Sequence, residues 1–244
     1  SIAVVACNKI ACSRNYAEYI HLKNLCHEFN TSFLFETNVG AGLPIIGTLN
    51  DLLKSGDKIR SIKAVLSGTL NFVFNNYDTT IPFASVVKQA QDEGFTEPDP
   101  RLDLGGTDVM RKILILARES GQHIEIDEIS NNGFLPPSCM EGSVDDFYKE
   151  LLVHENHFKK LYEVAKNNHC KLKFVATFEH NTAKVQLEHI PTDSPFYHLY
   201  GKDNLVLFFT KRYYDQPLVI KGAGAGADVT ASGIFADIIR AVKI

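Results

Sequence analysis

The sequence predicts an α/β segment joined to a larger α+β region, and three patterns support this fold class. Apolar runs and amphipathic stretches follow a strand–helix–strand–helix order over about the first 56 residues, which favours parallel strands. Four runs of strand length between residues 172 and 221 predict a largely antiparallel sheet. A glycine-rich loop after the last of these runs leads into a final helix.

In the α/β segment, each apolar run of strand length precedes a stretch with one apolar helical face. The predicted elements are a strand at 2–7, a helix at 14–29 with Ser13 as N-cap, a strand at 32–37, a glycine-containing turn at 38–44 and a helix at 45–53. Gly56 is expected to end this last helix.

The larger region begins with a strand and three helices. They are a strand at 62–66, a tight turn at 67–69, and helices at 70–76, 83–93 and 108–120, the last capped by Thr107 and ended by Gly121. Pro98 and Pro100 exclude a helix at 96–100. The later strands are expected at 172–179, 183–189, 205–210 and 218–221, and the final helix at 228–240.

Composition limits the classes of function. The chain has 25 Lys and Arg against 29 Asp and Glu with no block of like charge, which argues against a nucleic-acid binder. No apolar run approaches the ~18–20 residues of a membrane span. The five cysteines are scattered without C-x-x-C spacing, so we expect a reducing, cytoplasmic setting. The chain starts within a predicted strand and without Met, which suggests a piece of a longer polypeptide.

Two adjacent segments concentrate charged side chains. Residues 96–103 carry three carboxylates and an arginine in eight positions; such a run is more often solvated surface, but its prolines stiffen the backbone. Asp108 and Lys112 follow, four residues apart on one face of a helix whose next turns are apolar. An ion pair that leads into a buried helix is costly to desolvate and is often functional. Lys112 is therefore a candidate proton donor or acceptor.

Three further features are candidates for ligand binding, each with a plain structural alternative. Asn8 and Lys9 end the first strand, where ligands of open α/β sheets bind, although a single lysine there is more often surface. Glu36 precedes a turn whose carbonyls could join it around a hard cation. The loop at 222–227 fits G-x-G-x-x-A but lacks the second strand and acidic residue of a dinucleotide site, so it is either a flexible turn or a helix N-terminus near a polar ligand.

Six motifs in this order resemble homoserine dehydrogenase, over nearly the whole chain. They are NK at 8–9, ETNVGAGLP at 36–44, SGT at 67–69, TEPDP at 96–100, DVMRK at 108–112 and GAGADVTA at 224–231. Residues 117–121 and 213–240 are most similar to the dehydrogenase part of bifunctional aspartokinase–homoserine dehydrogenases.

The resemblance implies an enzyme that interconverts homoserine and aspartate 4-semialdehyde with NADP or NAD, in threonine and methionine biosynthesis. Its implied catalytic residues are Lys112, which gives its proton to the carbonyl oxygen, and Lys9. The implied substrate-binding residues are Glu97, Asp108, Asp103, Gly68 and Thr69, and the implied cofactor contacts are Lys9, Asn8 and Gly224. The implied sodium ligands are the Glu36 side chain and the carbonyls of Val39, Ala41 and Leu43.

The resemblance also implies a domain division. Residues 1–44 and 222–244 would form a partial Rossmann-type nucleotide-binding domain, with the Lys9 strand and the Gly224 loop side by side in one sheet. Residues 45–221 would form an inserted mixed-sheet catalytic and dimerisation domain. Because the pyrophosphate-binding glycines would lie upstream, we expect this chain alone to form a folded dimer that binds cofactor poorly and has no measurable dehydrogenase activity.

Other interpretations remain open at this level. A related dehydrogenase that acts on a different semialdehyde is one, and a regulatory or dimerisation module without catalysis is another. The small-molecule substrate, the homodimer and an aspartokinase domain fused upstream are expectations from the resemblance, and neither nucleic acid nor a membrane is an expected partner.

Overall fold

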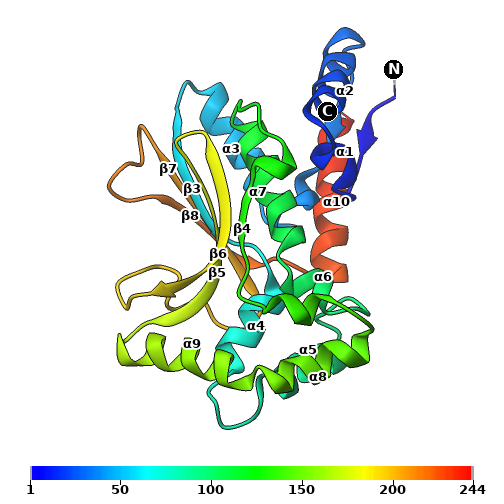
Figure 1. The fold of residues 1–244 in the computed structure, drawn as a ribbon. Helices are drawn as coiled ribbons and strands as arrows, with labels where there is room; N and C mark the ends of the chain where they lie inside the picture. Colours follow the sequence, from blue (N-terminus) through cyan, green and yellow to red (C-terminus); the bar gives the residue numbers. More distant parts are fainter. Residues whose placement is uncertain (1, 243–244) are drawn as a thin grey trace.

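The structure, a computed structural model, describes residues 2–242, and these form two sheets (Figure 1). The smaller is a parallel pair, β1 (Val4–Val5) and β2 (Phe33–Leu34). The larger has the order β4-β6-β5-β3-β7-β8. Its strands are β3 (Ile59–Val65), β4 (Ser130–Asn132), β5 (Lys171–Glu179), β6 (Thr182–Ile190), β7 (Asp203–Thr210) and β8 (Leu218–Ala223). Its pairings are antiparallel except β4 with β6, so the predicted mixed, largely antiparallel sheet is confirmed.

The described residues form ten α-helices, some packed on the large sheet and others beside the small sheet. They are α1 (Ile10–Ser13), α2 (Tyr16–Glu28), α3 (Ile45–Lys54), α4 (Gly68–Asn76), α5 (Phe83–Asp92), α6 (Arg101–Leu104), α7 (Thr107–Glu119), α8 (Val144–Val153), α9 (Glu155–Asn167) and α10 (Ala227–Ala241). Short 3-10 turns are η1 (Glu36–Asn38), η2 (Ile126–Glu128) and η3 (Pro137–Met140). Helix α7 packs on β5 and β6, and α4 and α9 pack on β5. Within residues 2–242, no helix is both long and apolar enough to cross a membrane.

The core lies between α7 and the large sheet. Residues 113–117 of α7 are completely buried, as expected for the apolar turns that follow Lys112. Helices α8 and α9 were not predicted, although Phe158, Leu161, Tyr162 and Ala165 of α9 have helical spacing and face the core.

Two helix starts differ from the prediction because other residues supply the caps. Ser13 is the last residue of α1, and Asn15 caps α2 by accepting a hydrogen bond from the Glu18 N–H at 2.9 Å. Gly106, not Thr107, is the N-cap of α7, and its φ of 78° lies in the left-handed region that glycine adopts without strain. A Cβ at Gly106 would lie 2.9 Å from the Phe174 ring, so packing also requires glycine here.

Two other elements also differ in extent. The strand predicted at 32–37 ends at Leu34, because the Glu36 N–H donates to Asp237 of α10 at 2.9 Å and the chain turns into η1. The turn predicted at 67–69 is the first turn of α4, which Ser67 caps by accepting from the Leu70 N–H at 3.1 Å.

The expected single sheet for the Lys9 strand and the Gly224 loop is wrong. β1 pairs with β2 in the small sheet, whereas β8 pairs with β7 at the edge of the large sheet. Helix α10 does return to the small sheet, where it packs on β1 and η1 (Figure 1). Gly233 permits this approach, since a Cβ there would lie 2.6 Å from Thr37 Cγ2.

Candidate active site

Asp108 joins two lysines at the N-terminus of α7. Its carboxylate lies 2.7 Å from Lys112 Nζ and 3.3 Å from Lys9 Nζ. The predicted shared helix face of Asp108 and Lys112 is thus confirmed. Lys9 reaches the same carboxylate from the N-cap of α1, since β1 ends at Val5 and not at Cys7 as predicted. Burial raises the pKa of Asp108, but the two lysine charges outweigh it and hold the pKa below its ordinary value.

Lys112 is held in one position by two acceptors. Its Nζ donates to the Leu66 carbonyl at 2.7 Å as well as to Asp108, and its side chain is 12% exposed. A lysine ammonium has three N–H donors, so these contacts leave one for a ligand. The Leu66 carbonyl also accepts from Asn204 Nδ2 at 3.4 Å, which fixes the acceptor itself.

A cavity of about 400 Å³ opens beside this ion pair. Its lining includes Gly68, Thr69, Glu97, Asp103, Asp108, Lys112 and Gly224 of the predicted site. Ser67, Thr96, Ala225 and Gly226 of the lining lie in motifs that the sequence singled out, whereas Glu93, Gly94, Phe95 and Lys202 were not predicted. Six separate segments therefore converge on this cavity, and no local sequence pattern signals that Lys202 belongs there.

Asp103 and Thr69 form the acidic wall of the cavity. Asp103 accepts a hydrogen bond from the Glu97 N–H at 2.8 Å, and Thr69 Oγ1 lies 3.4 Å from its other oxygen. Thr69 also donates to the Phe95 carbonyl. Burial raises the pKa of Asp103, and the negative charges of Glu97 and Asp108 add to this shift. A cationic ligand group is therefore favoured at this wall.

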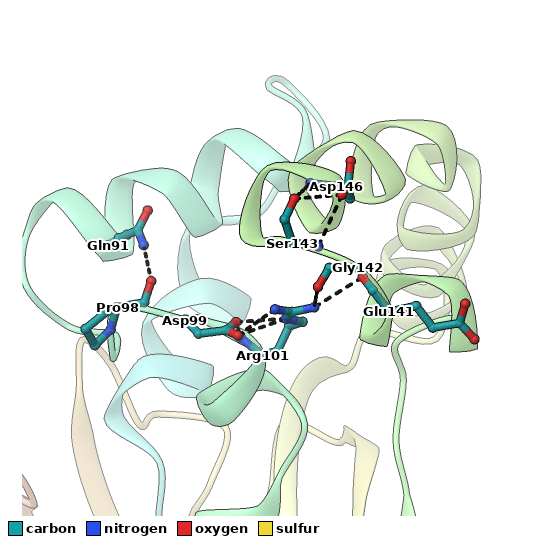
Figure 2. Close-up of polar contacts among 8 residues, drawn as sticks. All are labelled: Gln91, Pro98, Asp99, Arg101, Glu141, Gly142, Ser143 and Asp146. Carbon is teal, nitrogen blue, oxygen red and sulfur yellow. Dashed lines mark hydrogen bonds and ion pairs between the residues drawn. The ribbon is translucent and has the colours of Figure 1, made fainter.

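Side-chain contacts hold the loop at Pro98, Asp99 and Arg101 (Figure 2). Gln91 Nε2 donates to the Pro98 carbonyl at 3.0 Å. Asp99 points to Arg101 and pairs with it at 2.6 Å, so it takes no part in the cavity. The Arg101 hydrogen bonds lower the pKa of Asp99. These contacts fix the backbone that follows Glu97, whose side chain is exposed.

Arg101 ties this loop to the start of α8 (Figure 2). Its Nη1 donates to the Gly142 carbonyl at 2.8 Å. Ser143 and Asp146 form a reciprocal capping box at the next residues, which anchors the N-terminus of α8. These contacts attach the charged loop at residues 96–103 to the N-terminus of α8.

Asn8 and Gly224, which were predicted to contact the cofactor, lie differently relative to the cavity. Asn8 Oδ1 accepts from the Ile10 N–H at 2.8 Å and lies outside the cavity lining. Gly224 is buried in the lining, where a Cβ would lie 2.0 Å from Asn204 Cγ. Helix α10 begins directly after the lining residues Ala225 and Gly226, and no side chain caps it.

The proposed metal ligand Glu36 acts as a helix cap in this structure. Its buried carboxylate accepts from the Ile46 N–H at 2.6 Å and the Gly47 N–H at 2.8 Å, at the start of α3. Burial raises the pKa of Glu36, while these two N–H groups and Arg240, at 3.4 Å, oppose the shift. Among residues 2–242, no three His, Cys, Asp or Glu side chains are grouped to hold a metal ion.

Comparison with known proteins shows a match over most of the chain. The homoserine dehydrogenase family model matches residues 44–239. The chain is 41% identical over 242 residues to a chloroplastic bifunctional aspartokinase/homoserine dehydrogenase 2 of Zea mays, and 40% identical to bifunctional aspartokinase/homoserine dehydrogenase 2 of Escherichia coli. These alignments cover 98% and 99% of this chain but 26% and 30% of the relatives, so the chain spans under a third of their length.

Solved structures share the fold. A Candida auris protein of unknown function superposes with a TM-score of 0.93 at 36% identity, covering 99% of this chain and 70% of that one. A hyperthermophilic archaeal homoserine dehydrogenase in complex with NADPH gives a TM-score of 0.75 at 27% identity, covering 99% and 64%. The predicted combination of α/β and α+β parts is therefore confirmed by both the strand order and these neighbours.

Proposed function

Because the chain belongs to the homoserine dehydrogenase family, we propose that it forms the catalytic part of an oxidoreductase that interconverts L-homoserine and L-aspartate 4-semialdehyde with NADP or NAD. The observation that carries this proposal is the Lys9–Asp108–Lys112 cluster beside a cavity lined by carboxylates. The cavity size and its charges suit a small amino acid with one reacting oxygen.

Lys112 moves the proton in the proposed reaction. Its third N–H donor is directed to the substrate oxygen, so it donates to the carbonyl oxygen during reduction and its neutral amine accepts the hydroxyl proton during oxidation. Asp108 and the Leu66 carbonyl fix the Nζ position, and positioning of this kind lowers the barrier without further chemistry. Lys9 adds a second positive charge on the far side of Asp108.

The carboxylates and α4 bind the substrate. Glu97 and Asp103 supply negative charge for the substrate ammonium, and Thr69 supplies a hydroxyl. Gly68 brings the backbone of α4 to the cavity without a side chain, and a Cβ there would lie 2.9 Å from the Lys202 carbonyl oxygen. Asp108 completes the acidic wall.

The residues present fit the nicotinamide end of a dinucleotide. A bound cofactor supplies the hydride for this reaction. Gly224, Asn8 and Lys9 would hold it from two sides of α7, although only Gly224 lines the cavity. Near Gly224, Asn204 Oδ1 is buried and has no hydrogen-bond partner among the described residues, so an acceptor is available there.

Residues 1–44 and 222–244 form the nucleotide-binding part in this proposal, and residues 45–221 form the catalytic and dimerisation part. The packing of α10 on β1 supports the return of the chain to the first part. Strand β8, however, extends to Ala223 in the large sheet, which favours a boundary nearer to α10.

A sodium ion at Glu36, with the carbonyls of Val39, Ala41 and Leu43, is also proposed. Oxygen donors of this kind suit a hard cation, and a carboxylate oxygen that accepts one N–H retains a second lone pair. Sodium chloride is expected to raise the melting temperature more than tetramethylammonium chloride at equal ionic strength. The difference should vanish in Glu36→Gln; a difference of equal size in the variant would place the ion elsewhere.

The proposed assembly is a cytoplasmic homodimer with an aspartokinase domain upstream, in threonine and methionine synthesis. The bifunctional relatives support the fused kinase. The exposed Val219 on edge strand β8 leaves apolar surface for a second copy. Light scattering of the chain should give twice its 27.2 kDa mass, and the monomer mass would rule out the dimer.

Turnover by the complete polypeptide tests the function. We expect homoserine-dependent reduction of NADP or NAD, followed as absorbance of the reduced nicotinamide. A substrate one methylene longer should react at least 10-fold more slowly, since a methylene in a fitted pocket changes rates by about 10–200-fold. Preference for the longer substrate favours the related semialdehyde enzyme, and absence of turnover with either favours the non-catalytic module.

A further inference from the structure

The cavity has more negative than positive groups. Its lining holds the carboxylates of Glu93, Glu97, Asp103 and Asp108, but only two lysines, Lys112 and Lys202. Homoserine and its semialdehyde are zwitterions that carry an ammonium and a carboxylate. The acidic wall suits the ammonium, whereas the substrate carboxylate needs a cation that is not already neutralised.

Lys112 and Lys9 both contact Asp108. Lys112 contacts Asp108 and the Leu66 carbonyl, and its remaining donor is required at the reacting oxygen. Lys9 pairs with Asp108 and lies outside the cavity lining. Within residues 2–242, Lys202 is the cavity lysine that forms no ion pair with a carboxylate.

Lys202 lines the cavity from the turn before β7. Its Nζ lies 4.5 Å from the centroid of the Phe95 ring, which also lines the cavity. A cation over an aromatic ring is held only weakly at exposed sites, so the ring orients Lys202 without neutralising its charge.

The backbone beneath Lys202 is rigidly attached to α4. Asn71 Nδ2 donates to the Gly201 carbonyl at 3.0 Å and to the Asp203 carbonyl at 3.2 Å. The Lys202 carbonyl packs against Gly68, which has no room for a Cβ. The same helix that presents Gly68 and Thr69 to the substrate thus sets the position of Lys202.

We propose that Lys202 binds the α-carboxylate of the substrate and makes the cavity selective for amino acids that carry a free carboxylate. This inference rests on the proposed function. It assigns the substrate ammonium to Glu97 and Asp103 and the substrate carboxylate to Lys202. The reacting carbon then lies toward Lys112.

The test compares L-homoserine with its α-carboxamide in the complete polypeptide. Lys202→Met should raise KM for homoserine by about 10–100-fold, the worth of one hydrogen bond to a charged group, and change kcat less. KM for the carboxamide, which has no charge at this position, should stay within about 2-fold. Lys202→Arg should retain most of the homoserine affinity. Lys88→Met, on the exposed face of α5, is the matched control, and the melting temperature of each variant reports its folding.

The possible outcomes distinguish the role of Lys202 from the proposed function of the whole site. Equal losses on both substrates, or an unchanged KM for homoserine in Lys202→Met, would overturn the role of Lys202 while leaving the proposed function in place. Absence of homoserine turnover in the wild-type protein would overturn the proposed function, and this inference with it.

Discussion

Asp108 holds two ammonium groups that come from distant parts of the sequence. Lys112 lies one helical turn away, whereas Lys9 lies 99 positions earlier. Both carboxylate oxygens are used, one by each lysine. Asp108 is therefore the group that positions Lys112. Lys112, which has a free N–H donor, is the group that faces the substrate.

Replacing Lys112 by alanine is expected to lower kcat by about 10²–10⁴-fold, the usual range for the loss of a general acid or base. Steady-state kinetics of the complete polypeptide measure this, with Lys88→Ala as the control for loss of a surface lysine. A kcat close to that of the wild type would show that another group transfers the proton.

Glu97 offers a cleaner test of binding, because its carboxylate is exposed and the structure gives it no partner whose loss would unfold the loop. Glu97→Gln should raise KM for homoserine by about 10–100-fold, as expected for one charge-assisted contact. The melting temperature should be unchanged, since the loop is held by its backbone and by Arg101. An unaltered KM would remove Glu97 from the substrate site.

At the scale of elements, a buried lysine connects β5 to α4. Lys173 is completely buried, and its Nζ donates to Asn71 Oδ1 at 2.6 Å, Asn75 Oδ1 at 2.7 Å and the Leu199 carbonyl at 2.6 Å. Three oxygen acceptors match the three N–H groups of an ammonium. The cluster joins α4 to the loop that precedes β7, and these two elements carry Gly68, Thr69 and Lys202 of the cavity lining.

This cluster predicts a pH dependence of stability. Burial lowers the pKa of Lys173 to about 7, and the charge of Lys171 adds to this, against 10.5 in the unfolded chain. Between these values the unfolded state binds more protons, so the free energy of unfolding due to Lys173 rises with pH, by up to ~1.4 kcal/mol per unit. Below pH 7, Lys173 is protonated in both the folded and the unfolded state. The destabilisation that comes from burying its charge is therefore largest there.

Urea unfolding at several pH values between 6 and 10 measures this effect. The stability difference between wild type and Lys173→Met should shift in favour of the wild type as the pH rises through this window. Lys184→Met, on the exposed side of β6, should show no such shift. A difference that is constant with pH would mean that Lys173 keeps its proton throughout.

At the scale of the whole molecule, α7 also binds the first segment through its C-terminal end. Arg118 is buried and donates to the carbonyls of Cys12 at 3.0 Å and Arg14 at 2.6 Å. Glu119 accepts from Lys23 at 2.9 Å and from the Tyr19 hydroxyl. One helix therefore carries the candidate proton donor at its start and the attachment of α2 at its end.

Glu119→Gln should loosen this attachment without unfolding the large sheet. Removing the charged partner of a buried hydrogen-bonded group destabilises a protein by about 1–3 kcal/mol. In this variant the destabilisation is expected at the contact between α2 and α7. Hydrogen exchange should become faster in α2 and stay unchanged in β5. Equal acceleration in both would show that the molecule unfolds as one unit.

The sequence predicted elements where one local period continued for several turns or residues. Helices α3, α5 and α7 and strands β5 to β8 were predicted to within a few residues. Caps were predicted less well, because Ser13 and Asn15 are both capping residues and only the packed chain selects between them. Helices α8 and α9 had a helical pattern that went unassigned.

For the site, the sequence by itself determined the pairing of Asp108 with Lys112, because four residues span one helical turn and bring both side chains to one face. It also placed Glu97 in a stiff, charged loop. Tertiary structure alone decided that Lys9 pairs with Asp108, that Lys202 lines this cavity, and that Glu36 caps α3. The Lys9 and Lys202 contacts join segments far apart in the chain, and the Glu36 contact depends on the turn between η1 and α3. These contacts are stabilised by burial and by charge pairing in the folded molecule. The local periodicity of the sequence does not predict them.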